Sequence, residues 1–289
     1  LATCKEIDKI FETFDGSMLV SMILGLVDNQ NGFCYYINAE HPFAVLYRDG
    51  KASFLETKSF YRKLGTTDIQ GGIVVDTFQI LPGDVLLIGS DGRDDISISN
   101  GTDGTRVINE NENLFLGVVE ISDADLNRIY ENLLKQGEIT DDLSLLRLEY
   151  IGSPIHKKSL SNVEKKLIHT SRELQKQGNN QKAIDVLEQA NMLNPDHPDI
   201  IREKMKVYLN TKSYVRICEL AIPYISMRPD DTDMIYLTSY CLKKLKKYDA
   251  AIDYAERLKI RDPRNIIYML NLAEINLALG SVSKAEEIV

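Results

Sequence analysis

The sequence predicts two domains of different fold class, an α+β domain with an antiparallel sheet over residues 1–150 and an all-α repeat domain over residues 162–289. A linker at 151–161 joins them, where glycine, serine and proline interrupt both patterns. Three observations support this division. Short β-rich runs fill the first half, a fixed 34-residue period fills the second, and the charge balance changes sign between them.

In the first half, runs of four to nine residues that are mostly apolar are bounded by turn signals such as Asp-Gly and Pro-Gly-Asp, which predicts antiparallel hairpins. Helical spacing of apolar residues instead predicts helices over residues 2–13 and 122–136, the second opening with Ser122 as its cap. The predicted strands, in order, are 22–27, 33–38, 44–47, 52–56, 72–80, 85–90 and 141–150.

The second half repeats every 34 residues. Pro195, Pro229 and Pro263 keep this spacing, and each follows an apolar helical pattern. A helix–turn–helix unit of this length, with small residues where the helices cross, is the tetratricopeptide (TPR) signature. The interval predicts repeats at about 162–195, 196–229 and 230–263 and part of a fourth. The alternative is an unrelated helical bundle, which would not keep several positions in register.

Composition narrows the class of protein. Residues 1–150 hold 12 Lys and Arg against 25 Asp and Glu, net −13, and the remainder hold 22 against 18, net +4. An acidic first half disfavours nucleic acid as a partner. No apolar run approaches the roughly 18 residues of a membrane span, so we expect a cytoplasmic protein. The four cysteines are isolated from one another, which predicts reduced structural thiols.

Acidic residues cluster at the ends of two predicted strands. Asp91, Asp94 and Asp95 follow the run "VLLIGS", and Asp141 and Asp142 begin "DDLSLLRLEY". If the two strands are antiparallel neighbours, the end of one lies beside the start of the other, so both clusters meet at one rim of the sheet. Carboxylates brought that close repel one another unless a cation neutralises them, and hard divalent ions prefer such oxygens.

Each cluster also has a structural interpretation. Asp-Gly after a strand is a common hairpin turn, and an aspartate at the start of a strand is often a solvated cap. His41 could be a ligand or a general acid, but no second histidine lies at ligand spacing, which favours a structural hydrogen-bonding role.

Three motifs, in order, give the first half a specific resemblance. They are "SMILGLVDNQNGFCYYINAEHP", "LPGDVLLIGSDGRDD" and "DDLSLLRLEY". Residues 1–150 resemble the C-terminal two-thirds of a PPM-type, metal-dependent serine/threonine phosphatase domain of the bacterial SpoIIE/RsbU-like branch. The resemblance implies an α-β-β-α sandwich, here incomplete, and a centre for two Mn²⁺ or Mg²⁺ ions in the complete domain.

The resemblance also implies roles for individual residues. Asp91 and Asp141 correspond to metal ligands, while Gly92, Asp95 and Asp142 correspond to neighbours of those ligands. The family's earlier motifs, G-D-x-x-D and G-D-V-x-G-H-G, are absent from these 289 residues. We expect them to precede Leu1, and we expect the chain as given to bind metal weakly.

Two functions follow from these interpretations. The first is a metal-dependent phosphoserine/phosphothreonine phosphatase in bacterial signalling, whose repeats recognise a peptide or protein. By resemblance, its substrate class is a phosphorylated anti-sigma-factor antagonist. The alternative is a catalytically silent phosphatase fold that acts as a TPR peptide-binding adaptor. The two differ in whether the residues encoded before Leu1 complete the metal site.

Overall fold

The computed structural model describes residues 2–56, 62–66, 73–100, 106–111, 113–151 and 159–288. The chain divides into two compact units, Leu1–Pro154 and Ile155–Val289. Most of the linker predicted at 151–161 lies outside the described residues. Each unit is described by itself below.

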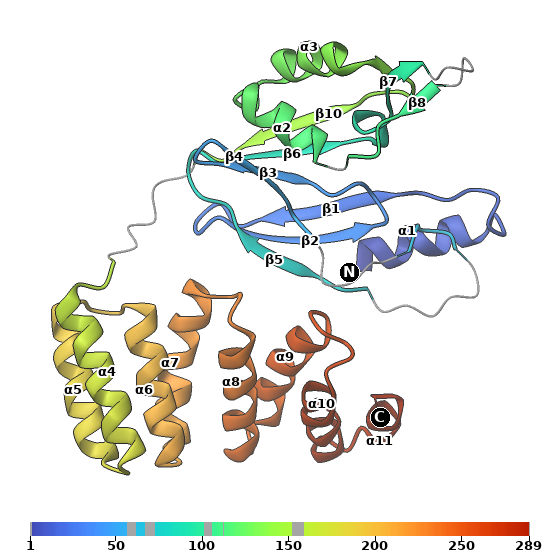
Figure 1. Cartoon of the computed structure of the whole chain (residues 1–289). Coiled ribbons are helices and arrows are strands. Elements are labelled where there is room, and N and C mark those ends of the chain that lie inside the picture. Colours follow the sequence, from blue (N-terminus) through green and yellow to red (C-terminus); the bar gives the residue numbers. More distant parts are fainter. Residues whose placement is uncertain are drawn as a thin grey trace. The chain divides into compact units, whose positions relative to one another are not determined.

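Within its described residues, the first unit combines strands with three α-helices and one short 3-10 helix (Figure 1). Its elements are α1 (Ala2–Glu12), β1 (Met22–Val27), β2 (Phe33–Ala39), β3 (Val45–Arg48), β4 (Lys51–Phe54), β5 (Asp76–Gln79), β6 (Val85–Gly89), η1 (Asp91–Arg93), β7 (Ile96–Asn100), β8 (Arg106–Ile108), α2 (Leu114–Ile121), α3 (Leu126–Gln136), β9 (Glu138–Ile139) and β10 (Leu145–Glu149).

These elements form stacked layers, with α2 and α3 over one sheet and α1 beside the other (Figure 1). The described strands pair in the orders β1-β2-β5, β10-β6-β3-β4 and β8-β7-β9, and all pairs are antiparallel. Cys4 of α1 packs in one apolar cluster with Ile37 and Ala39 of β2. The α-β-β-α fold class predicted from the sequence is confirmed.

Strand β6 shows how the sequence specifies these layers. Its four apolar residues point alternately to the two faces of the sheet, as the period of two in a strand requires. Val85 and Leu87 pack with α2 and α3, whereas Leu86 and Ile88 pack with residues of the β1-β2-β5 sheet. A continuous apolar run is therefore the pattern of a strand covered on both faces.

Two predictions for this unit need correction. The helix expected over 122–136 begins at Leu126, and its cap is Asp125, whose carboxylate accepts a hydrogen bond from the Arg128 amide. Ser122 is not a cap, because Asp123 and Ala124 take positive φ angles of 50° and 53° and form a turn after α2. Helix α2 and strands β7 to β9 were not predicted at all. The strand expected over 72–80 spans only 76–79, since residues 73–75 and 80 are described and are not in a strand.

The second unit consists of helices in antiparallel pairs, with one pair in each 34-residue repeat (Figure 1). Its elements are α4 (Asn162–Lys176), α5 (Asn180–Leu193), α6 (Pro198–Asn210), α7 (Tyr214–Met227), α8 (Thr232–Lys244), α9 (Tyr248–Lys259), α10 (Ile266–Ala278) and α11 (Val282–Ile288).

The register of the repeats follows the predicted period. Ala183, Ile217, Ala251 and Ala285 occupy the same position in the second helix of successive pairs, and all four are buried. Each of the spaced prolines falls in the connection between one pair and the next. The predicted TPR solenoid is confirmed.

Two further findings concern the whole described chain. The four cysteines are free thiols, and three of them are buried, as isolated structural cysteines should be. Among the helices in the described ranges, none combines the length and the apolar character that crossing a lipid bilayer requires.

Candidate metal centre

The candidate site lies where β6 ends and β10 begins. The two strands are antiparallel neighbours, and their register pairs Gly89 with Leu145. This pairing was predicted from the sequence and is confirmed. It brings together two segments that are about 50 residues apart in sequence, residues 90–96 and 139–144.

Three carboxylates converge at this rim. Asp91, Asp95 and Asp141 can each offer one oxygen such that the three oxygens lie within 4.8 Å of one another. Asp91 and Asp141 are exposed, and Asp95 is half-buried. The sequence analysis placed Asp95 beside the ligands. The structure puts its carboxylate in the same cluster as Asp91 and Asp141.

Local backbone turns place these side chains. Asp91 opens the short helix η1, and its carbonyl accepts hydrogen bonds from the amides of Asp94 and Asp95. The chain therefore turns back within five residues, which brings Asp95 to the same side as Asp91. On the other segment, the Asp141 carboxylate accepts a hydrogen bond from the Asp142 amide at 2.7 Å.

Side-chain and backbone hydrogen bonds join the two segments. The Ser90 hydroxyl donates to the Asp142 carbonyl at 2.8 Å and accepts from the Ser144 amide at 2.9 Å. The amide and the hydroxyl of Thr140 both donate to the Asp95 carbonyl at 2.9 Å. The distance between the two acidic groups is thus fixed by contacts on both sides of the cluster.

Gly92 allows the closest approach between the segments. A Cβ atom at this position would lie 2.5 Å from the Asp142 carbonyl oxygen and 3.0 Å from that of Asp141, too close for any side chain. Glycine is needed at position 92 because there is no space for a side chain. Backbone conformation does not explain it, because the φ angle of Gly92 is not in the left-handed region that favours glycine. Asp142 contributes its backbone to this contact, and its carboxylate is not part of the cluster.

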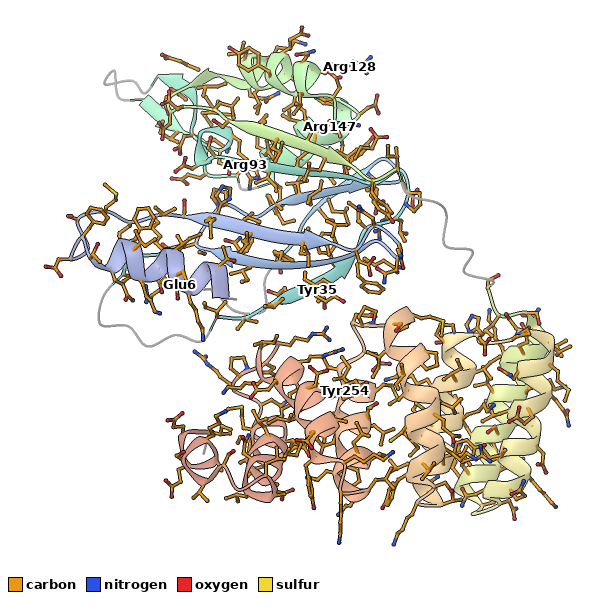
Figure 2. The ribbon with its side chains drawn as sticks, turned by 180° about the vertical axis from the view of Figure 1, so that it is seen from behind. Glu6, Tyr35, Arg93, Arg128, Arg147 and Tyr254 are labelled. Carbon is orange, nitrogen blue, oxygen red and sulfur yellow. The ribbon has the colours of Figure 1, made fainter. Side chains whose placement is uncertain are left out.

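Arg93, labelled in Figure 2, connects η1 to helix α2 and strand β4. Its side chain is 2% exposed, and its guanidinium lies 4.9 Å from the ring centroid of Phe115 in α2 and 5.6 Å from that of Phe54 in β4. Its Nε donates to the Asp94 carboxylate at 3.0 Å. A buried arginine stacked between two aromatic rings fixes the position of the loop that carries Asp91.

His41 is not in the cluster. Its backbone amide donates to the Asn38 side chain at 2.8 Å, and its Nδ1 lies 2.9 Å from the Pro42 carbonyl oxygen. These contacts hold the turn after β2, which agrees with the structural role expected from its setting.

The donor set of the cluster suits a hard divalent cation. All three groups offer carboxylate oxygens, which Mg²⁺ and Mn²⁺ prefer, and they lie at the solvent-exposed rim where such ions keep several waters. In the part of the chain that the structure describes, no lysine or arginine forms an ion pair with any of the three. The three carboxylates are therefore free to share a cation.

Comparison with known families agrees with the fold of both units. The profile of Stage II sporulation protein E (SpoIIE) matches residues 2–151, and a tetratricopeptide repeat profile matches residues 171–197. The first unit is thus a domain of the PPM phosphatase fold, and the second is a TPR array. The chain belongs to the SpoIIE family.

Three solved structures illustrate weaker likenesses, each with a TM-score below 0.5. The MamA RS-1 ArsTM double mutant is 22% identical, covering 45% of this chain and 72% of that one, with a TM-score of 0.42. MamA 41-end from Desulfovibrio magneticus RS-1 is 19% identical over 60% and 90% (TM-score 0.41). The first TPR domain of human RPAP3 is 20% identical over 42% and 96% (TM-score 0.37). No curated protein matches the chain.

Proposed function

We propose that the protein is a metal-dependent phosphoserine/phosphothreonine phosphatase in bacterial signalling, and that its repeats recruit a protein partner. The observation that supports the proposal most directly is the convergence of Asp91, Asp95 and Asp141 from two distant segments. Membership of the SpoIIE family supports the interpretation of these three carboxylates as metal ligands of a phosphatase.

In this proposal, Asp91 and Asp141 bind Mn²⁺ or Mg²⁺, and Asp95 adds a third oxygen from the same rim. Gly92 and Asp142 hold the two segments at the separation that the ligands need. When bound, such an ion lowers the pKa of a water and draws charge from the phosphoryl oxygens. The complete domain is expected to hold two ions, by resemblance to the family.

We assign the substrate to the class of phosphorylated anti-sigma-factor antagonists, again by resemblance. The second unit would select the partner, since TPR arrays present a surface on which a peptide can lie. A second candidate function, a catalytically silent adaptor, is supported by a groove between α6, α8 and α10 that needs no metal.

The test is phosphate release from a phosphoserine peptide in excess Mn²⁺, using the gene product that contains these residues. Asp91→Asn keeps the side-chain volume and removes one ligand charge. We expect it to lower turnover by at least about 100-fold. Mutating a residue that only hydrogen-bonds to a metal ligand costs up to about 100-fold, so loss of a ligand should cost at least as much.

Asp49→Asn is the matched control. Asp49 lies in the β3–β4 turn, at the other end of the sheet from the cluster, with φ of 50°, which asparagine tolerates. Turnover should be unchanged in this variant. Equal turnover in wild type and Asp91→Asn would refute the assigned role, and an inactive wild type that still binds a partner would establish the adaptor.

A further inference from the structure

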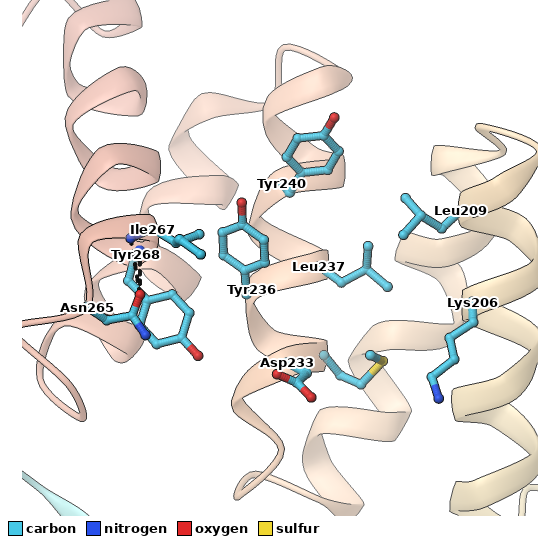
Figure 3. Close-up of a pocket in the computed structure, with 10 residues that line it drawn as sticks. Lys206, Leu209, Asp233, Tyr236, Leu237, Tyr240, Asn265, Ile267 and Tyr268 are labelled. Carbon is cyan, nitrogen blue, oxygen red and sulfur yellow. Dashed lines mark hydrogen bonds between the residues drawn. The ribbon is translucent and has the colours of Figure 1, made fainter.

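The second unit contains a groove of about 580 Å³ between three helices (Figure 3). Helix α6 contributes Lys206 and Leu209, α8 contributes Tyr236 and Tyr240 among others, and α10 contributes Tyr268. These are the first helices of three successive repeats, so the groove runs across repeats. Its volume lies in the range of about 300–1,000 Å³ that is usual for ligand sites.

The side chains that line the groove differ from one repeat to the next, although the helices have the same arrangement in each repeat. Tyr240 shares its phase of the 34-residue period with Arg172, Lys206 and Glu274. The same position thus carries a charge in three repeats and an aromatic ring only in the third. An aromatic ring at the Tyr240 position is therefore not a requirement of the repeat. Tyr236, Tyr240 and Tyr268 also pack against the apolar core of the unit, and their half-buried rings leave aromatic surface at the groove.

The aromatic rings form one continuous surface. The Tyr236 and Tyr240 centroids are 6.4 Å apart with ring planes at 29°, and the Tyr236 and Tyr268 centroids are 5.8 Å apart at 36°. All three side chains are half-buried. Beside them lie two exposed aliphatic residues, Leu209 at 37% and Ile267 at 58%. The rings of Tyr236 and Tyr268 offer flat apolar area to a side chain that can stack on them, whereas the ammonium groups of Lys243 and Lys244 already lie 5.6 and 5.1 Å from the centroid of Tyr240.

The two charged residues that line the groove, Asp233 and Lys206, already have ionic partners outside it. Asp233 pairs with Arg202 at 3.0 Å, and Lys206 pairs with the buried Glu203 at 2.9 Å. A charged ligand would have to compete with these ion pairs. It would gain little electrostatic attraction, because the two lining charges are opposite and cancel. Charge complementarity therefore favours a ligand segment that carries no net charge.

The polar groups that remain include three tyrosine hydroxyls, each of which can donate one hydrogen bond. Among the described residues, no partner accepts a hydrogen bond from the hydroxyls of Tyr236, Tyr240 or Tyr268. The Asn265 carboxamide oxygen is occupied, because it caps α10 by accepting from two backbone amides. A matching ligand therefore supplies carbonyl acceptors for the three hydroxyls.

We propose that this groove binds an extended, uncharged, proline-containing segment of a partner protein. Proline rings stack on aromatic faces, and the carbonyls of such a segment accept hydrogen bonds from the tyrosine hydroxyls. Proline has no backbone N–H to satisfy, and the polyproline II conformation is largely preformed, which lowers the entropic cost of binding. This inference rests on the proposed role of the repeats in recruiting a partner and names the chemistry of that partner.

The test is fluorescence anisotropy of the whole 289-residue chain with labelled peptides of equal length. The first probe is built from Pro-Pro-Leu-Pro repeats, the second replaces each proline by alanine, and the third replaces each leucine by glutamate. We expect the first probe to bind at least about tenfold more tightly than either of the others, a ratio that corresponds to about 1.4 kcal/mol.

Variants identify the surface. Tyr236→Phe combined with Tyr240→Phe keeps both rings and removes two donors, so we expect binding of the first probe to weaken about fivefold or more. Tyr254→Phe is the matched control, since Tyr254 lies on α9 and does not line the groove (Figure 2). Thermal melts verify that all variants are folded.

The results separate this inference from the proposed function. Tightest binding of the glutamate probe would overturn the inference and leave partner recruitment standing. No binding of the proline probe, or binding that the Tyr236→Phe/Tyr240→Phe double variant leaves unchanged, would also overturn it. Phosphatase turnover is measured separately and does not depend on any of these outcomes.

Discussion

The acidic rim and the tyrosine groove are built in opposite ways. The rim joins two segments about 50 residues apart, and a network of short contacts between them fixes the positions of Asp91, Asp95 and Asp141. The groove takes its residues from equivalent helices of a repeat, and each helix is held mainly by its neighbours. Chemistry on a phosphoryl group demands fixed ligands, whereas recognition of a partner demands a surface that can vary from repeat to repeat.

This contrast has an energetic consequence. A change in the rim acts on one closely packed contact, so it should affect the first unit alone. A change in the array weakens one interface between helices, and stability in repeat arrays depends on nearest-neighbour interfaces. The following predictions test whether the two units respond separately, from the largest expected effect to the smallest.

The largest effect is expected for Ala251→Phe. Ala251 is fully buried in α9, and its carbonyl accepts a hydrogen bond from Ser239 of α8 at 3.0 Å. A phenyl ring there forces the helices apart, at a cost of about 3 kcal/mol or more. We expect the second unit to unfold or loosen while the first stays folded. Ala250→Phe, at an exposed position of the same helix, should change little.

Thiol labelling can follow the two units separately. Burial raises the pKa of Cys34 in β2 to about 11 and the pKa of Cys241 in α8 to about 12, so neither thiol reacts readily while its unit is folded. In Ala251→Phe, mass spectrometry should show rapid labelling of Cys241 and continued protection of Cys34. If both thiols became reactive together, the units would not be independent.

The next effect is expected for Gly92→Ala. The added methyl would overlap the Asp142 carbonyl oxygen, so the two acidic segments must separate, at a cost of about 1–3 kcal/mol. We expect a lower melting temperature of the first unit and weaker Mn²⁺ binding by calorimetry. Gly117→Ala in α2 is the matched control, because nothing lies within 4 Å of its added Cβ and alanine favours a helix by up to about 1 kcal/mol. Equal melting of the two variants would contradict the packing role of Gly92.

The smallest effect concerns Glu203 of α6. Burial opposes its ionised form, but hydrogen bonds from Arg172 and Lys206 outweigh burial and hold the pKa of Glu203 below its ordinary value of 4.5. A carboxyl with a lowered folded-state pKa stabilises the fold above pH 4.5, and this contribution is lost as the pH falls through the folded-state pKa. Glu203→Gln should cost the second unit about 1–2 kcal/mol at neutral pH.

The pH dependence distinguishes this effect from simple loss of packing. On acidification, the melting temperatures of wild type and Glu203→Gln should converge, because protonation removes the charge from the wild type too. Glu256→Gln, at an exposed position of α9, serves as the control. A constant difference across the pH range would show that the charge of Glu203 does not stabilise the unit.

The sequence predicted the repeats better than the first unit, for a physical reason. Each helix pair packs on its sequence neighbours, so the period of Ala183, Ala251 and Ala285 reports the packing directly. The layers of the first unit depend on contacts between distant segments, yet the apolar run of β6 and the turn signals around it were enough to predict an antiparallel sheet. Helix α2 was missed because its apolar run lacks a polar face that would reveal a helical period.

The rim was predictable in outline but not in detail. Strand pairing predicts that Asp91 and Asp141 lie at one rim, but it does not predict the turn in η1 that brings Asp95 to them. Ser90 and Arg93 were also missed, because a serine after a strand and an arginine among aspartates both look like solvated turn residues. Their roles depend on Asp142, Phe54 and Phe115, which no local pattern connects to them.

The ion pairs between neighbouring repeats carry one more consequence. Arg172 pairs with Glu203, Arg202 with Asp233, and Lys243 with Glu274, each time 31 residues further along the chain. The three pairs lie at different heights along their helices, so each junction between repeats matches only its own neighbour. A single exposed ion pair contributes little to stability. A chain in which no repeat kept its natural neighbour would, however, lose all three ion pairs at once. The ion pairs thus favour the natural order of the repeats. Duplicating or reordering repeats in this array should cost more stability than its regular backbone suggests.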